Sequence, residues 1–354
     1  MNYSAWGKFG RNQPMGTVFP ISCEELTMIA VTGSAGLVGG NLARTLLADG
    51  CKVRALVHRQ RKALAGLDVE VVEADLTNRD SLIRAFSGVE TVYHLGGLIS
   101  IQMDNWDDLA AVNVEGTRNV VEACLECGVR RLVHFSSVHA LQQEPLDAPL
   151  DESRPFVTRA DAPPYERSKA AADLIVREGI ERGLDAVLIF PTAIAGPFDF
   201  RPSYIGMALR MLAGDRIPAL VSGGYNWVDV RDVVAGAIQS ERLGAAGSSY
   251  ILSGHWNTIQ EVAQMVSAHT GKPAPRWIIP LWLAQWAEPF MAKLARLNGT
   301  GPLYTRAMLN ALRSNRLVSH ARATRELGYH PRPLRETVAD TLQWFAAQEK
   351  GQDV

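Results

Sequence analysis

The chain has 354 residues, of which 47% are hydrophobic and 21% are charged, and its net charge at pH 7 is −1. This composition is typical of a soluble globular protein, and the length allows one large α/β unit with an added lobe. A nearly neutral chain without a long block of lysine and arginine is not expected to bind nucleic acid.

The first residues and the cysteines carry little information about function. Residues 1–27 lack the apolar core of a signal peptide and have no clear period, so we interpret them as a disordered extension or as a start codon assigned upstream of Met28. Cys124 and Cys127 form a C-x-x-C without a second pair or a nearby histidine, so no metal site is expected. We expect a cytoplasmic protein without a transmembrane segment.

A glycine-rich turn follows the first apolar run of the chain. Residues 28–31 read as a strand, and a helical pattern follows over 37–49. Glycine adopts positive φ and lets the backbone approach a ligand, while the free N–H groups at a helix start attract a pyrophosphate. This context predicts a dinucleotide phosphate site formed by Gly33, Ser34, Gly36, Leu37, Val38 and Gly39.

Beyond the turn, short β-rich runs alternate with helical runs. Such alternation predicts an α/β fold with a Rossmann-type doubly wound parallel sheet, whose ligands lie beyond the carboxyl ends of the strands. Strands are predicted over 51–57, 69–73, 91–95, 131–136 and 186–190, and helices over 78–88, 113–127 and 165–183.

The alternation ends near Pro197, after which proline, glycine and aromatic residues are frequent. Helices are predicted over 258–270, 303–312 and 334–348, and they no longer alternate regularly with strands. We expect a nucleotide-binding domain over 28–196, to which part of the later chain returns, and a smaller, mainly helical substrate lobe over 197–354.

Tyr165 and Lys169 are four residues apart on a predicted helix, so both side chains are expected on one face. A nearby ammonium favours the phenolate and should lower the pKa of the tyrosine from about 10 by roughly one to three units, which suits a general acid or base. Tyr-x-x-x-Lys alone is common by chance. Ser136 and Ser137 end the strand 131–136, where a hydroxyl can hold a substrate oxygen beside the phenol, and their position favours a catalytic site.

With the glycine turn, Ser-Ser and Tyr-x-x-x-Lys in this order, the chain resembles the extended short-chain dehydrogenase/reductase family of the NAD-dependent epimerase/dehydratase superfamily. More narrowly, it resembles the dihydroflavonol-4-reductase and 3β-hydroxysteroid-dehydrogenase-like branch. Further matches are Ala-Asp-Leu-Thr at 74–77, Asn-Val-Glu-Gly-Thr at 113–117, Val-Asp-Val-Arg-Asp at 228–232 and Glu-Leu-Gly-Tyr at 326–329.

The resemblance implies a role for each matching residue. Tyr165 would be the proton donor or acceptor, Lys169 would bind the nicotinamide ribose, and Ser137 would hold the reacting oxygen. Cofactor contacts would also come from Asp75, Leu76, Leu95, Gly96, Gly97 and Pro191. The family often has Ala-Ala where this chain has Gly96-Gly97, and we expect the glycines to loosen this loop.

The end of the second predicted strand bears on the choice of cofactor. An NAD enzyme of this fold usually ends this strand with a carboxylate for the adenosine ribose. Here His58 and Arg59 follow the strand, with Arg61 and Lys62 behind them, and such cations suit a 2′-phosphate. NADP is therefore expected and NAD is less favoured, with a solvated basic loop as the alternative interpretation.

The segment after the sixth strand bears on the reaction. Relatives that act on nucleotide sugars usually carry Arg-x-x-Asn-Val-Tyr-Gly-Pro there, whereas residues 190–197 read Phe-Pro-Thr-Ala-Ile-Ala-Gly-Pro. We therefore expect an oxidoreductase that reduces a ketone, or oxidises the matching secondary alcohol, of an apolar small molecule. A nucleotide-sugar epimerase or dehydratase is the first alternative, and a non-catalytic NADP-binding redox sensor is the second.

Several residues are candidates for the substrate side. His139, Arg201 and Tyr204 are expected to line the pocket. The uncharged segment 277–286 contains three tryptophans and is far too short to span a bilayer, which takes about 20 residues. It is interpreted as a lid over an apolar pocket, with ordinary core or shallow membrane contact as alternatives. The resemblance also implies a homodimer.

Overall fold

The computed structural model describes residues 27–100, 105–297 and 305–351. The prediction for residues 1–27 therefore lies outside the described residues except for Thr27. No helix in these three ranges has both the length and the apolar composition needed to cross a bilayer.

The central element is a parallel sheet of seven strands in the order β10-β6-β5-β4-β1-β2-β3. The strand order reverses between β1 and β4, which places a crevice at the carboxyl ends of these two strands. The strands are β1 (Met28–Thr32), β2 (Lys52–Val57), β3 (Glu70–Glu73), β4 (Val89–His94), β5 (Arg131–Phe135), β6 (Ala186–Pro191) and β10 (Ser249–Leu252).

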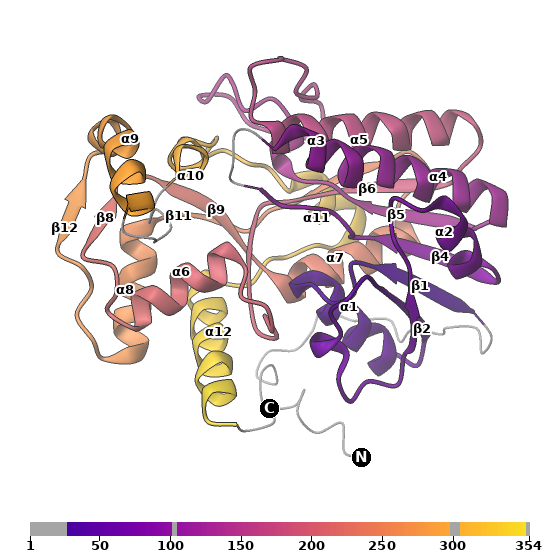
Figure 1. Ribbon diagram of the computed structural model, residues 1–354, viewed down its shortest axis with the longest axis horizontal. Helices are drawn as coiled ribbons and strands as arrows, with labels where there is room; N and C mark the ends of the chain where they lie inside the picture. Colours follow the sequence, from indigo (N-terminus) through magenta and orange to yellow (C-terminus); the bar gives the residue numbers. More distant parts are fainter. Residues whose placement is uncertain (1–26, 101–104, 298–304, 352–354) are drawn as a thin grey trace.

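Helices cover both faces of the sheet (Figure 1). One face packs against α2 (Arg79–Phe86), α4 (Gly116–Cys127) and α5 (Pro164–Glu181). The other packs against α1 (Leu37–Ala48), α7 (Val230–Leu243) and α11 (Ala321–Leu327). A strand buried on both faces needs a continuous apolar run, and all six residues of β6 are buried.

The predicted α/β fold with a doubly wound parallel sheet is confirmed, and the predicted strands agree with β2 to β6 to within two residues at each end. The later chain returns to this sheet through α7, β10 and α11. Leu252 and Leu327 lie in the same apolar cluster as Val31. Residues on both sides of the predicted boundary at 196 thus contribute to one core.

The remaining elements form a smaller lobe at the carboxyl edge of the sheet (Figure 1). Its core contains Leu209, Trp227, Val262 and Leu342. It has a three-stranded sheet of β7 (Ala193–Ala195), β9 (Gly224–Asp229) and β11 (His255–Thr258), and a pair of β8 (Ala219–Val221) with β12 (Trp277–Ile279). Its helices are α6 (Tyr204–Ala213), α8 (Ile259–Thr270), α9 (Leu281–Leu297), α10 (Arg306–Ala311) and α12 (Leu334–Glu349).

The connections after β4 and β5 carry short helices that matter for the site. After β4 come α3 (Trp106–Leu109) and a π-helical turn, η3 (Ala110–Glu115). After β5 comes a 3-10 turn, η4 (Val138–Ala140). One further 3-10 turn, η2 (Lys62–Leu64), follows β2. Cys124 and Cys127 are free thiols on α4, and burial raises the pKa of both.

Candidate active site

The glycine turn lies in the crevice between β1 and β4. Gly33 has a φ of +66°, and a Cβ there would lie 2.8 Å from the backbone N of Gly96. A Cβ on Gly39 would overlap the carbonyl oxygen of Gly33. Gly36 is the N-cap of α1, so no side chain caps the first N–H groups of this helix. Leu37 and Val38 form its first turn. A close backbone turn with free helix N–H groups fits the phosphates of a dinucleotide.

Ser34 joins this turn to the end of β2. Its buried hydroxyl donates a 2.8 Å hydrogen bond to the carbonyl oxygen of Leu56. The side chain is therefore engaged within the fold, and Ser34 as a whole is buried. The bond holds the loop after β2 close to the phosphate turn.

The ends of β2 and β3 combine cations with a carboxylate. His58 and Arg59 are exposed, and His58 Nε2 lies 3.9 Å from Asp75 Oδ2. Asp75 Oδ1 accepts hydrogen bonds from the backbone N–H and the hydroxyl of Thr77, at 2.9 and 2.8 Å. These bonds lower the pKa of Asp75. Arg61 Nη2 lies 3.5 Å from Glu73 Oε2.

A chain of hydroxyl and imidazole groups fixes the loop after β4. The Thr32 hydroxyl accepts from the backbone N–H groups of Leu95 and Gly96, at 3.1 and 3.0 Å. It also contacts His94 Nδ1 at 2.8 Å, while His94 Nε2 lies 3.1 Å from the Thr117 hydroxyl. Thr117 donates to the carbonyl oxygen of Asn113, so it must accept from Nε2, and Thr32 donates to Nδ1. His94 is therefore neutral, and burial holds its pKa well below the usual range.

Asn113, in the π-helical turn η3, holds the next part of this loop. Its side chain accepts from the Leu98 N–H at 2.7 Å and donates to the Leu98 carbonyl and the Ser168 hydroxyl, both at 3.0 Å. A Cβ on Gly97 would lie 3.0 Å from Asn113 Oδ1 and 4.0 Å from Lys169 Nζ. The loop thus runs beside the lysine, as a cofactor-binding loop should.

The expectation that Gly96 and Gly97 loosen this loop is wrong. A Cβ on Gly96 would lie 2.9 Å from Leu76 Cδ1 and 3.1 Å from the Thr32 hydroxyl oxygen. The loop is packed against these side chains, so glycine here permits a closer approach.

Ser137 and Tyr165 converge beyond the end of β5. Ser137 is the residue before η4, and Tyr165 is in the first turn of α5. The Ser137 hydroxyl lies near the Tyr165 phenol and lowers its pKa. Pro191 ends the neighbouring strand β6, and it is buried. The sheet therefore brings the two predicted hydroxyls to one point of its carboxyl edge.

The predicted effect of Lys169 on Tyr165 is wrong in this structure. Burial raises the pKa of Tyr165 to about 12, and the Ser137 hydroxyl opposes the rise only in part. Lys169 is itself buried, which lowers its pKa, and its ammonium donates a 2.8 Å hydrogen bond to the carbonyl oxygen of Phe135. Tyr165 therefore keeps its proton at neutral pH in this structure.

Beneath this pair lies a buried carboxyl group that the sequence analysis missed. Asp173 accepts a hydrogen bond from the Ser136 hydroxyl at 2.6 Å and contacts His134 Nε2 at 3.1 Å. Burial raises the pKa of Asp173 to about 7, while Ser136 and the charge of Lys169 lower it. The residue stands four positions after Lys169 on α5, a spacing that could have indicated a shared face. The sequence analysis likewise gave Asn113 no role beyond its place in the motif at 113–117.

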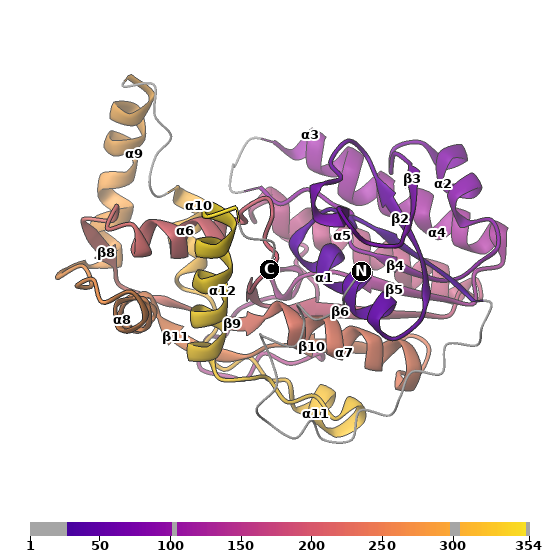
Figure 2. The same ribbon diagram turned by 90° about the horizontal axis from the view of Figure 1, so that it is seen from below.

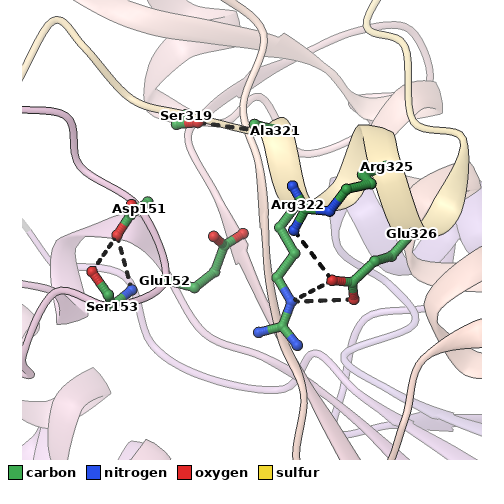
Figure 3. Close-up of a pocket in the computed structure, with 8 residues that line it drawn as sticks. All are labelled: Asp151, Glu152, Ser153, Ser319, Ala321, Arg322, Arg325 and Glu326. Carbon is green, nitrogen blue, oxygen red and sulfur yellow. Dashed lines mark hydrogen bonds and ion pairs between the residues drawn. The ribbon is translucent and has the colours of Figure 1, made fainter.

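The substrate side of the site is less complete. His139 lines a cavity of about 20 Å³ with Thr192 and Asn226. Arg201 and Tyr204 are exposed at and before the start of α6. A larger surface pocket of about 450 Å³ lies elsewhere, between residues 151–153 and α11 (Figure 3). Arg322 and Arg325 in this pocket pair with Glu326, and the pocket contains none of the predicted site residues.

The sheet topology and the glycine turn at its switch point define a Rossmann-type nucleotide-binding protein, with a hydroxyl pair beside the cofactor crevice. The chain belongs to the NAD dependent epimerase/dehydratase family, whose model matches residues 29–250. The predicted family is thereby confirmed. Proteins of this family and fold bind NAD(P).

Named relatives cover nearly the whole chain. A Sterol demethylase protein B of Methylococcus capsulatus is 38% identical over 327 residues, 91% of this chain and 98% of its own. A putative dihydroflavonol 4-reductase of Synechocystis sp. is 31% identical over 325 residues, 89% of this chain and 93% of its own. Enzymes named 3β-hydroxysteroid dehydrogenases match at 29% and 27% identity. The crystal structure of gox2253 superposes with a TM-score of 0.80 at 32% identity, over 92% of this chain and 99% of that one. The relatives are oxidoreductases, in agreement with the predicted enzyme class.

Proposed function

We propose that this protein is an NADP-preferring oxidoreductase that reduces a ketone of an apolar small molecule, or oxidises the matching secondary alcohol. The observation that carries the proposal is the convergence of Ser137, after β5, and Tyr165, in the first turn of α5, at the carboxyl edge of the sheet. Gly97 lies on the loop that follows the switch-point strand β4, close to Lys169. Lys169 comes four residues after Tyr165 on the same helix, α5.

The residues of the pair have separate tasks. The Ser137 hydroxyl donates a hydrogen bond to the carbonyl oxygen of the substrate and holds it against Tyr165. When bound in the crevice, NADPH would supply the hydride for the carbonyl carbon. The Tyr165 phenol then gives its proton to the oxygen, which leaves a neutral alcohol. A tyrosine pKa of about 12 in the free protein keeps this proton in place until the oxygen becomes basic.

Lys169 is a cofactor-binding group in this proposal. Its ammonium lies beside the Gly97 loop and donates to the carbonyl oxygen of Phe135 at 2.8 Å. A ribose hydroxyl bound at this loop would be a further acceptor for the ammonium. The positive charge would then also favour the Tyr165 phenolate that remains after proton transfer.

The preference for NADP is supported by the cations after β2. Arg59 is exposed, and Ser34 holds the end of this strand against the phosphate turn. Asp75, at the end of β3, is the nearest candidate for a ribose carboxylate. Asp75 lies 3.9 Å from His58 and accepts a hydrogen bond from Thr77. It therefore follows β3, whereas the ribose carboxylate of an NAD enzyme of this fold usually ends β2.

An apolar substrate is supported by β7 and by the relatives. Ala193, which is partly buried, and Ala195, which is buried, stand where nucleotide-sugar enzymes of this fold carry asparagine and tyrosine. The relative from Methylococcus capsulatus is named for a sterol reaction, and an enzyme of Stenotrophomonas maltophilia is named a 2-alkyl-3-oxoalkanoate reductase. Both names describe apolar carbon skeletons.

The direct test is cofactor consumption with a panel of substrates. Purified protein is mixed with NADPH or NADH and with steroid ketones, alkyl oxoacids or aryl ketones, and absorbance at the nicotinamide band is followed. We expect turnover with at least one apolar ketone, faster with NADPH. Conversion of a UDP-sugar without net change in the cofactor would support the epimerase instead. Tight NADPH binding with no turnover in either assay would support a redox sensor.

A further inference from the structure

The C-terminal lobe exposes an aromatic surface that the proposed reaction does not use. Four large rings are mostly accessible: Trp277 on β12 is 77% exposed, and Trp282, Trp286 and Phe290 on α9 are 69%, 68% and 66% exposed. We call these four residues, with the adjoining Ile278, Leu283 and Met291, the aromatic surface. Such exposure excludes the ordinary-core interpretation of the segment. A contiguous exposed apolar patch is typical of an interaction site.

The aromatic surface is the outer face of a helix whose inner face is already packed. Leu281 and Ala284 contact the small core cluster of Val221, Leu309 and Leu312. Trp282, Trp286 and Phe290 follow at intervals of four residues on another side of α9, and the rings of Trp286 and Phe290 lie 5.6 Å apart. Figure 2 shows α9 projecting away from the rest of the lobe. The helix therefore presents its aromatic side to the surroundings.

The charge around this surface is strongly one-sided. Glu288 is the only acidic residue between Val262 and Arg325, whereas this stretch contains eight lysines and arginines. The whole chain has a net charge of −1, so the positive charge is local. Lys272 and Arg276 are exposed just before Trp277, and Arg306, Arg313 and Arg316 are exposed beyond α9.

We propose that the aromatic surface docks on the surface of a lipid bilayer that contains anionic lipids. Tryptophan prefers the boundary between headgroups and acyl chains, where its ring is in an apolar layer and its N–H remains hydrated. Lysine and arginine next to the buried rings are attracted to anionic headgroups, by about 1 kcal/mol for each cation near the surface. α9 has 17 residues and lies in the interface without spanning it.

A second copy of the chain fits the aromatic surface less well. Two copies facing each other would bring the same excess of positive charge together, and like charges at an interface oppose association. A bilayer supplies the opposite charge instead. It is also where an apolar substrate of the proposed class accumulates, a link that rests on the proposed function. The docking itself rests only on exposure and charge.

The experiment is co-sedimentation with vesicles of phosphatidylcholine alone or with added phosphatidylglycerol. The full-length protein should pellet with the anionic vesicles at low salt, and less at about 0.5 M salt, where charges are screened within a few ångströms. The triple variant Trp282→Ser, Trp286→Ser, Phe290→Ser should bind these vesicles more weakly by a factor of about ten or more. The matched control, Val71→Ser, Leu174→Ser, Leu243→Ser, removes three apolar side chains that are 39%, 45% and 61% exposed elsewhere. It should bind like the unmodified protein.

Two results would overturn the proposal. One is the absence of vesicle binding, or binding that is equal in the triple variant and the control. The other is a dimer in light scattering that the triple variant loses, which would assign the aromatic surface to a second copy. Circular dichroism checks that both variants are folded. NADPH consumption with a water-soluble ketone, measured without vesicles, should be equal in both variants, so a failure of the proposed reaction is seen separately.

Discussion

The Ser136 hydroxyl donates a 2.6 Å hydrogen bond to the buried carboxylate of Asp173, while the hydroxyl of the next residue, Ser137, lies near Tyr165 and lowers its pKa. Neighbouring residues in an extended backbone point to opposite sides, so the two serines serve different partners. Ser136 connects β5 to α5 inside the fold. Ser137 is left facing the crevice, beside the phenol that the proposed reaction needs.

Replacement of Asp173 should therefore weaken the fold. Asp173→Ala leaves the Ser136 hydroxyl and His134 Nε2 without their buried acceptor, and we expect a loss of about 2–4 kcal/mol in the free energy of unfolding. Asp173→Asn keeps an acceptor oxygen and should lose less. Urea unfolding followed by circular dichroism measures both. An alanine variant as stable as the unmodified protein would show that this bond is unimportant.

The two serines can be separated by kinetics. Ser137→Ala removes the group that holds the substrate oxygen, so kcat should fall by about 10². Ser136→Ala, the matched control, removes a hydroxyl of the same size that faces Asp173, so it should lower stability and change kcat only a few-fold. Steady-state rates at saturating NADPH give the comparison. Equal losses of kcat in both variants would contradict the assignment of Ser137.

Tyr165→Phe tests the proton donor. Without the hydroxyl no group in the pair can protonate the oxygen directly, and we expect turnover to fall by about 10³ or more. The affinity for NADPH, measured by fluorescence titration, should change by less than about twofold, because the cofactor contacts assigned here come from other residues. Turnover close to that of the unmodified protein would remove Tyr165 from the mechanism.

The sequence was informative where a residue's role depends on its neighbours in the chain. The spacing of Gly33 and Gly39 predicts a close turn, and the four residues between Tyr165 and Lys169 predict one face of α5; the structure has both. These features follow from local geometry, which a sequence pattern records directly.

The pKa values and long-range hydrogen bonds of the site could not be predicted from the sequence in the same way. The raised pKa of Tyr165 depends on how deeply the fold buries it, and the Lys169 ammonium is held by the carbonyl oxygen of Phe135, 34 residues earlier in the chain. Likewise the bond from Thr32 to His94 joins two strands 62 residues apart. Such contacts depend on the order of strands in the sheet, and no local pattern encodes them.

The preference between cofactors can be tested at Arg59. Arg59→Asp places a carboxylate where a 2′-phosphate is expected, so kcat/KM with NADPH should fall. The ratio of kcat/KM with NADPH to kcat/KM with NADH should decrease by about tenfold or more. Arg84→Asp is the matched control. It changes the same charge at an exposed position in the last turn of α2, away from the carboxyl edge of the sheet. A ratio that is equal in the two variants would show that Arg59 does not select the phosphate.

The pH dependence of stability can be tested at Glu166, the residue after Tyr165. Glu166 lies 3.6 Å from His139, its side chain is only 24% exposed, and burial raises its pKa from 4.5 to about 7. Because the folded pKa lies above the unfolded one, the folded state binds this proton more tightly. The free energy of unfolding should therefore decrease as the pH rises from about 4.5 to 7.

Glu166→Gln removes this titration while keeping the shape of the side chain. The variant should be more stable than the unmodified protein at pH 8 by about 1–3 kcal/mol, and the difference should vanish near pH 4. Asp173 titrates in the same range in both proteins, so the quantity to compare is the difference between their urea unfolding curves. Glu181→Gln, an exposed position at the end of α5, is the control. If the difference in unfolding free energy between Glu166→Gln and the unmodified protein were the same at pH 4 and pH 8, ionisation of Glu166 would not destabilise the folded state. The raised pKa of Glu166 would then be refuted.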